Sequence, residues 1–158
     1  MNPIKAHLLD ALRPQVPPMT ESEYLPLALR TWTAPMRGTE QGRQYLLYGL
    51  LSEFGEVADV MKKHLQNGTP LGEVRRRLVD EIGDVLWYAT VLRFEALESA
   101  TAIIPNWVSM MLADENGHDF ASWVKATGIT FEECRAANIA KLTSRAERGV
   151  IQGSGGDR

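Results

Sequence analysis

Two long segments with apolar residues at three- and four-residue spacing are joined by only four residues, Asn67-Gly68-Thr69-Pro70. Apolar residues at this spacing fall on one face of a helix, so the pattern predicts helices over about 40–66 and 70–99. Asn67-Gly68 is typical of a left-handed helix end, and Thr69-Pro70 of an N-cap followed by proline. Because so short a connection allows only antiparallel neighbours, we expect a helical hairpin.

Capping patterns mark two further helices. Thr20 with Glu23 and Thr130 with Glu133 are capping boxes, which predict helices over about 20–33 and 130–147. Thr39 is the expected cap of the helix over about 40–66. Strand patterns are weak, so we expect one all-α domain over 1–158, similar to a four-helix bundle. We interpret about 100–128 as an insert with short helices over 107–112 and 120–126, and about 149–158 as a flexible tail.

The segment over 70–99 carries a second apolar face, formed by Trp87, Val91 and Phe94, opposite its main apolar stripe. A helix that is apolar on two sides is buried on two sides. Either the remaining helices cover this face or another subunit does, and we expect a homodimer or a dimer of dimers.

Composition narrows the classes of protein. A formal charge of −3 and a pI near 5.6 argue against a nucleic-acid surface, and we interpret Arg75-Arg76-Arg77 as a solvated helix face. No apolar run is long enough to cross a membrane, and the first residues lack a signal-peptide pattern, so we expect a cytoplasmic protein. The single cysteine, Cys134, excludes disulfides within the chain and is expected to be a packing residue.

Four acidic residues stand beside the apolar stripes of the hairpin. Glu53 and Glu56 share one flank of the first helix, and Glu81 and Asp84 share one flank of the second. In an antiparallel pair these carboxylates can converge, and oxygen ligands favour Mg²⁺ or Mn²⁺ over softer metals. Acidic pairs at this spacing are also common on solvated helix faces. Spacing alone therefore leaves both interpretations open.

The residues around these carboxylates closely resemble the paired E-x-x-E and E-x-x-D signature of the MazG-like all-α nucleoside triphosphate pyrophosphohydrolases. The similar segments are 51–63, which reads LSEFGEVADVMKK, and 80–88, which reads DEIGDVLWY. Residues 24–33 resemble the first helix of the family, and 138–145 resembles its terminal N-x-x-K-L-x-x-R segment. The part from about 96 to 129 is longer than the connection that many members have.

This resemblance implies a function. The family hydrolyses a nucleoside triphosphate between the α and β phosphorus atoms, giving the monophosphate and pyrophosphate. By resemblance, a Mg²⁺ centre would be held by four ligands, of which one acts as general base: Glu53, Glu56, Glu81 and Asp84. Candidate phosphate contacts are Lys141 and Arg145, and the candidate contact to base or sugar is Asn138.

Three further residues are candidates for substrate binding, each with a plainer alternative. Lys62 can reach a phosphate or lie at a solvated helix end, Tyr88 can line the pocket or pack in the core, and Trp32 can stack on a base or pack in the core. Two other functions stay open: a non-catalytic helical nucleotide-binding or regulatory module, and a phosphoribosyl-nucleotide pyrophosphohydrolase. A di-iron bundle is disfavoured because no histidine forms a Glu-x-x-His motif in the hairpin.

Overall fold

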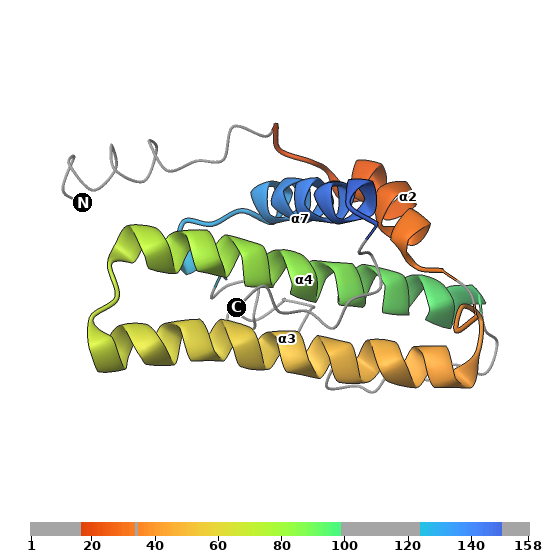
Figure 1. Cartoon of the computed structure of the whole chain (residues 1–158), viewed down its shortest axis with the longest axis horizontal. Coiled ribbons are helices and arrows are strands. Elements are labelled where there is room, and N and C mark those ends of the chain that lie inside the picture. The colour runs from red at the N-terminus through yellow and green to blue at the C-terminus, as the bar shows by residue number, and fades with distance from the viewer. Residues whose placement is uncertain (1–16, 34, 99–123, 150–158) are drawn as a thin grey trace.

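The computed structural model describes residues 17–33, 35–98 and 124–149, and within these ranges the all-α prediction is confirmed (Figure 1). The main helices begin and end within two residues of the predicted bounds. They are α2 (Glu21–Thr31), α3 (Glu40–Asn67), α4 (Leu71–Glu98) and α7 (Phe131–Glu147). Residues 124–126 form one further helical turn. Residues 100–123 of the predicted insert and 150–158 of the predicted tail lie outside the described residues.

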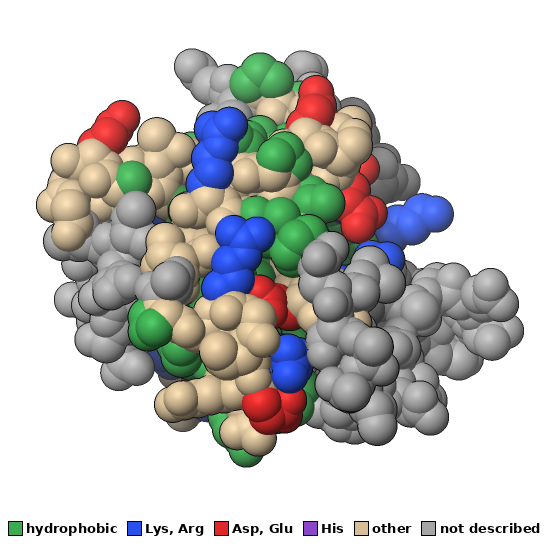
Figure 2. Space-filling view, turned by 90° about the vertical axis from the view of Figure 1, so that its right-hand side faces the viewer, with side chains coloured by type: hydrophobic (Ala, Val, Ile, Leu, Met, Phe, Trp, Pro, Cys, Tyr) green, Lys and Arg blue, Asp and Glu red, His purple; other side chains and the backbone are tan. Residues whose placement is uncertain are grey.

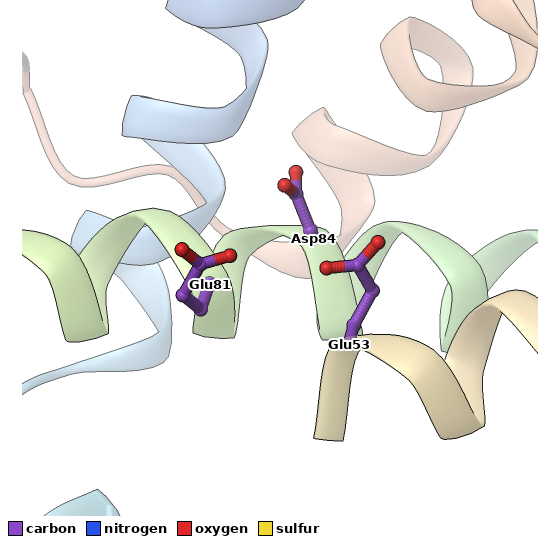
Figure 3. Close-up of side chains that lie close together, drawn as sticks. All are labelled: Glu53, Glu81 and Asp84. Atoms are coloured by element: carbon purple, nitrogen blue, oxygen red, sulfur yellow. The ribbon is translucent and has the colours of Figure 1, made fainter. Parts of the chain in front are cut away.

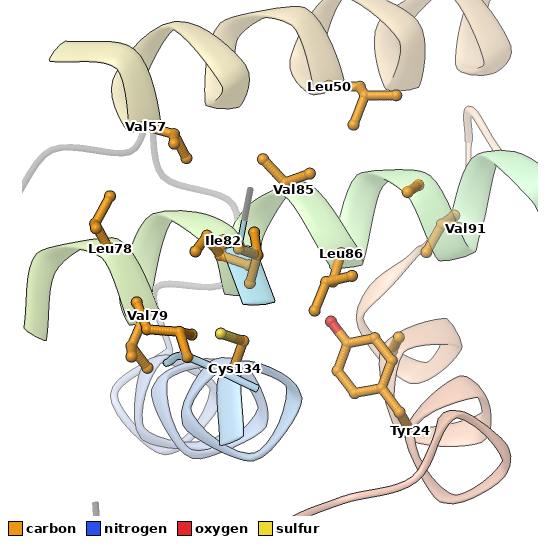
Figure 4. Close-up of a cluster of buried hydrophobic side chains, with 14 of the residues drawn as sticks. Tyr24, Leu50, Val57, Leu78, Val79, Ile82, Val85, Leu86, Val91 and Cys134 are labelled. Carbon is orange, nitrogen blue, oxygen red and sulfur yellow. The ribbon is translucent and has the colours of Figure 1, made fainter. Parts of the chain in front are cut away.

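Helix α4 lies between the other helices. Helix α3 runs antiparallel along one side of it, and α2 and α7 pack against the other side (Figure 1). Figure 4 shows apolar side chains leaving α4 in both directions, toward Leu50 and Val57 on α3 and toward Tyr24 and Cys134 on α2 and α7. Two layers of apolar packing therefore meet at one central helix.

This arrangement explains the second apolar face of α4. Val91 is fully buried, and the indole nitrogen of Trp87 donates a hydrogen bond of 2.8 Å to Oγ1 of Thr31 on α2. The ring of Phe94 lies under the guanidinium of Arg37, with 5.7 Å from Cζ to the ring centroid. The chain's own segments therefore cover this face, and it gives no reason for a second subunit.

The predicted caps of α2, α3 and α7 are confirmed, whereas α4 begins at Leu71, one residue after the predicted start. In the first capping box, Thr20 N donates to the carboxylate of Glu23 over 2.9 Å, and Glu23 N donates to Thr20 Oγ1. Thr39 Oγ1 accepts from Gly42 N at the start of α3. Gly68 closes α3 with φ 68°, a conformation that glycine adopts without strain. Gly68 N donates to His64 O over 2.9 Å, so this cap ends α3 at the turn of the hairpin.

The Arg75-Arg76-Arg77 interpretation is wrong for its first member. Arg76 is exposed, but Arg75 is 7% exposed and its guanidinium pairs with Glu133 on α7 at 2.5 Å. The start of α7 covers Arg75, so the arginine is buried together with a carboxylate rather than solvated. The Cys134 prediction is confirmed, because the thiol is fully buried, and burial raises its pKa.

On the face in Figure 2, Lys and Arg side chains alternate with acidic and apolar ones and do not form one basic patch. Among the described helices, none combines the length and apolar character that crossing a membrane requires.

A candidate metal centre between α3 and α4

Three of the four predicted carboxylates come together. Glu53 reaches from α3 toward Glu81 and Asp84 on α4, and one oxygen of each lies within 4.8 Å of the others (Figure 3). All three side chains are half-buried. Glu56 is exposed and lies outside this group, although its negative charge raises the pKa of both Glu53 and Glu81.

Burial and neighbouring negative charges raise the pKa values of carboxyl groups in the cluster. Burial, and then the charges of Asp84 and Glu81, raise the pKa of Glu53 to about 7. Burial and the Asp84 charge also raise the pKa of Glu81. Desolvation and like charges both disfavour the ionised form of a carboxylate, and a bound cation reverses both effects. The three side chains are therefore arranged to take up either protons or a cation.

Helix α7 supplies polar groups to Asp84. The side-chain amide of Asn138 donates to Asp84 Oδ1 over 2.7 Å, and Lys141 Nζ lies 2.5 Å from both Asp84 oxygens. Arg145 follows one helical turn after Lys141 and is half-buried. The structure thus brings two of the three predicted α7 residues to the acidic cluster and places the third next along the same helix.

A glycine makes this close approach possible. A Cβ atom at Gly83 would stand 2.9 Å from the carbonyl oxygen of Cys134 and 3.0 Å from Cβ of Asn138. Real Cβ atoms rarely come so close, so α7 packs directly on the α4 backbone here. Gly55, the other glycine next to the motif, faces open space. Of these two glycines, Gly83 is therefore the one with a steric role in the site.

Tyr88 lies one turn after Asp84 and borders the cluster. Its ring packs where a side chain at Gly49 would stand. Burial, a hydrogen bond with Tyr45 and the charges of Glu53 and Asp84 all raise the pKa of Tyr88, so its hydroxyl keeps its proton. Tyr88 therefore borders the acidic cluster as a neutral group that hydrogen-bonds to Tyr45.

Trp32 packs among other aromatic side chains. It is 5% exposed, and its indole nitrogen donates over 2.7 Å to Glu95, a buried carboxylate that also accepts from Gly38 N. Tyr45 stacks on it with ring centroids 6.0 Å apart and an interplanar angle of 13°. The accessible ring is therefore that of Tyr45, which is 44% exposed and which the sequence did not single out.

Lys62 stands apart from the cluster. It is exposed and pairs with Asp59 at 2.6 Å, and Lys63 pairs with the same carboxylate at 2.6 Å. Hydrogen bonds from both lysines lower the pKa of Asp59 to about 2. Lys62 follows Glu53 by nine residues, which is roughly 13 Å along the axis of α3. The structure does not bring it to the carboxylates.

The fold and the carboxylate cluster define an all-α domain with a candidate hard-cation site. Residues 41–106 match the MazG nucleotide pyrophosphohydrolase domain, and this stretch contains all four predicted ligands. The chain is also 32% identical over 120 residues to the "Gene 37 protein" of Mycobacterium phage L5, a stretch covering 75% of this chain and 78% of that relative. No solved structure matches. The chain belongs to the MazG nucleotide pyrophosphohydrolase family, as its sequence resemblance predicted.

Proposed function

We propose that this chain is a cytoplasmic, Mg²⁺-dependent nucleoside triphosphate pyrophosphohydrolase, which converts a ribo- or deoxyribonucleoside triphosphate to the monophosphate and pyrophosphate. The observation that carries the proposal is the convergence of the Glu53, Glu81 and Asp84 oxygens to within 4.8 Å in a chain of this family.

The residues of the cluster suit the cation. Carboxylate oxygens without nitrogen or sulfur ligands favour Mg²⁺, with Mn²⁺ as a substitute. Glu53, Glu81 and Asp84 would hold it, and Glu56 would join from the exposed side. When bound, Mg²⁺ neutralises phosphate oxygens and lowers the pKa of a water molecule. One of the four carboxylates then takes the proton of the attacking water.

The positive side chains on α7 suit a polyphosphate. Lys141 stands 2.5 Å from Asp84, and Arg145 follows it by one turn, so two cations border the acidic cluster along one helix. We propose that they bind and orient the triphosphate. Arginine is well suited to this because its guanidinium matches phosphate oxygens in pairs.

We propose that the base of the nucleotide lies near the ring of Tyr45. Tyr45 is exposed and can stack on a base, whereas the ring of Trp32 is covered. Tyr88 would line the path between the ring of Tyr45 and the carboxylates. Asn138 is 1% exposed, and both ends of its amide are hydrogen-bonded within the chain, so its location favours a positioning role over contact with base or sugar.

One assay tests the proposed function. The purified full chain is incubated with Mg²⁺ and a panel of canonical and modified nucleoside triphosphates together with phosphoribosyl nucleotides, and products are followed by ³¹P NMR. We expect monophosphate and pyrophosphate, and we expect EDTA or Asp84→Asn to abolish their release. Glu73→Gln removes an exposed carboxylate from the same helix and serves as the matched control.

Three results would contradict the proposal. Release of inorganic phosphate alone would mean a different bond is cleaved. Mg²⁺-dependent nucleotide binding without turnover would support a regulatory module. Activity restricted to phosphoribosyl nucleotides would support a phosphoribosyl-nucleotide pyrophosphohydrolase instead.

We also propose that the chain forms a homodimer, or a dimer of dimers, through the outer side of α3. Tyr48, Leu51 and Leu65 are 67%, 44% and 81% exposed there, within an arc of about 100° around the helix. In an antiparallel α3–α3 contact, Lys62 and Lys63 of one copy come near Glu40 of the other. These opposite charges attract, and the antiparallel helix dipoles also favour the contact.

Light scattering tests the dimer. Leu51→Glu should give a monomer, whereas Leu71→Glu, an exposed leucine outside α3's outer side, should not change the mass. A monomer for the unaltered chain at high concentration would contradict the contact.

A further inference from the structure

A chain of hydrogen bonds runs through the core from α2 to the acidic cluster. The hydroxyl of Tyr24, a fully buried residue of α2, donates over 2.8 Å to Oδ1 of Asn138 on α7. Nδ2 of the same amide donates over 2.7 Å to Oδ1 of Asp84 on α4. Three helices therefore meet in one line of polar contacts.

The chemistry of the groups sets the direction of this chain. An ionised carboxylate only accepts hydrogen bonds, so the amide nitrogen of Asn138 must face Asp84. The amide oxygen then faces Tyr24, and its hydroxyl is the donor that this oxygen needs in a buried setting. Without the Tyr24 hydroxyl, the amide oxygen of Asn138 would be a buried acceptor without its hydrogen bond from Tyr24. The amide would then keep only its hydrogen bond to Asp84.

Asp84 has a second partner with different properties. Lys141 reaches both of its oxygens, but from a flexible four-carbon stem that is 26% exposed. Asn138 is 1% exposed and packs against Gly83, so its amide is the rigid member of the pair. The orientation of the Asp84 carboxylate therefore depends most on the amide that Tyr24 holds.

We propose that Tyr24 is a positioning residue for the metal centre, which acts through Asn138 to keep the Asp84 carboxylate facing Glu53 and Glu81. The inference rests on the metal centre of the proposed function. Groups that hydrogen-bond to a metal ligand orient it, and their loss typically weakens metal affinity about 10- to 100-fold. Tyr24 lies on α2, before the residues 41–106 that match the family domain, and it reaches the carboxylates only through its tertiary contact with Asn138.

Mn²⁺ binding measures the effect without turnover. The full chain is titrated with Mn²⁺, and the free ion is followed by electron paramagnetic resonance. Tyr24→Phe keeps the buried ring and removes only the hydroxyl, and we expect the Kd for Mn²⁺ to rise about 10-fold. Circular dichroism should show unchanged helicity.

The control variant removes a comparable contact elsewhere on α2. Thr31→Val deletes the 2.8 Å hydrogen bond from Trp87, which links α2 to α4 and is not one of the hydrogen bonds that reach Asp84. It should lower the melting temperature about as much as Tyr24→Phe does. We expect it to leave the Kd for Mn²⁺ within about two-fold of the unaltered chain, since no group that holds a metal ligand is touched.

A double variant tests the path through Asn138. If Tyr24 acts through this amide, Tyr24→Phe in an Asn138→Ala background should weaken Mn²⁺ binding no further. Additive effects, or a Tyr24→Phe variant that binds Mn²⁺ as the unaltered chain does, would overturn the inference. Absence of Mn²⁺ binding by the unaltered chain would overturn it together with the metal centre. Intact binding without nucleotide turnover would overturn the proposed function and leave the role of Tyr24 standing.

Discussion

Gly83 and Asn138 are in direct contact across the α4–α7 interface: a methyl group added to Gly83 would stand 3.0 Å from Cβ of Asn138 and 2.9 Å from the carbonyl oxygen of Cys134. Asn138 in turn donates to Asp84, the next residue after Gly83. The absence of a side chain at Gly83 is therefore what allows α7 to bring its polar groups to the carboxylates of α4.

Gly83→Ala should push α7 away from α4. We expect a loss of about 1–3 kcal/mol in the free energy of unfolding, as is typical of overpacked cores, and a loss of pyrophosphate release. Gly55→Ala is the matched control, because nothing lies within 4 Å of the added methyl group. It should stabilise the chain by roughly 0.5–1 kcal/mol through helix propensity. Urea unfolding followed by circular dichroism compares the two, and equal stabilities would contradict the close packing.

Metal binding should depend on pH because of Glu53. Its pKa is about 7 without metal, so below pH 7 a cation must displace a proton from the cluster. Mg²⁺ affinity should rise with pH up to about 7 and level off above it. Calorimetric titrations in two buffers with different ionisation enthalpies measure the released protons. Glu53→Gln should bind more weakly and release fewer protons. Proton release that is unchanged in this variant would assign the titration to another group.

The same raised pKa predicts how stability changes with pH in the metal-free chain. A carboxylate whose pKa is raised on folding binds protons more tightly in the folded state. Its contribution to stability is fully present below the ordinary pKa of 4.5 and is lost as pH rises through about 7. The pKa of Glu81 is raised as well, so it acts in the same direction. In EDTA, the melting temperature should therefore fall between pH 5 and 7.5, and Mg²⁺ should restore it. A melting temperature that rises over this range would contradict the repulsion between these carboxylates.

Local signals in the sequence predicted the helices well. The capping residues Thr20, Thr39 and Thr130 act on atoms within three residues of themselves, and Gly68 ends α3 through its own backbone conformation. Such features do not depend on the rest of the chain, so the sequence specifies them directly.

Packing between segments that are far apart in the sequence decides which residues belong to the site. Helical phase puts Glu53 and Glu56 on the same flank of α3, but only the rotation of α3 against α4 decides that Glu53 points inward and Glu56 outward. Tyr24 meets Asn138 across 114 positions, and Trp32 meets Glu95 across 63. No periodicity within one helix encodes these partners, so the sequence did not reveal them.

Arg75 and Arg76 also show that the sequence pattern of one helix does not reveal which residues distant segments bury. The two arginines provide a test. They are neighbours in one basic run, yet Arg75 is buried against Glu133 while Arg76 is 69% exposed at its side chain. Removing one partner of a buried ion pair leaves an uncompensated charge, so Arg75→Met should lower the free energy of unfolding by about 3–5 kcal/mol. Arg76→Met should change it by less than about 0.5 kcal/mol, as surface substitutions do. In the double variant Arg75→Met with Glu133→Gln, neither member of this buried pair is charged, and part of the lost stability should return. Urea unfolding of the four chains measures these differences, and equal effects of the two single substitutions would show that Arg75 is solvated after all.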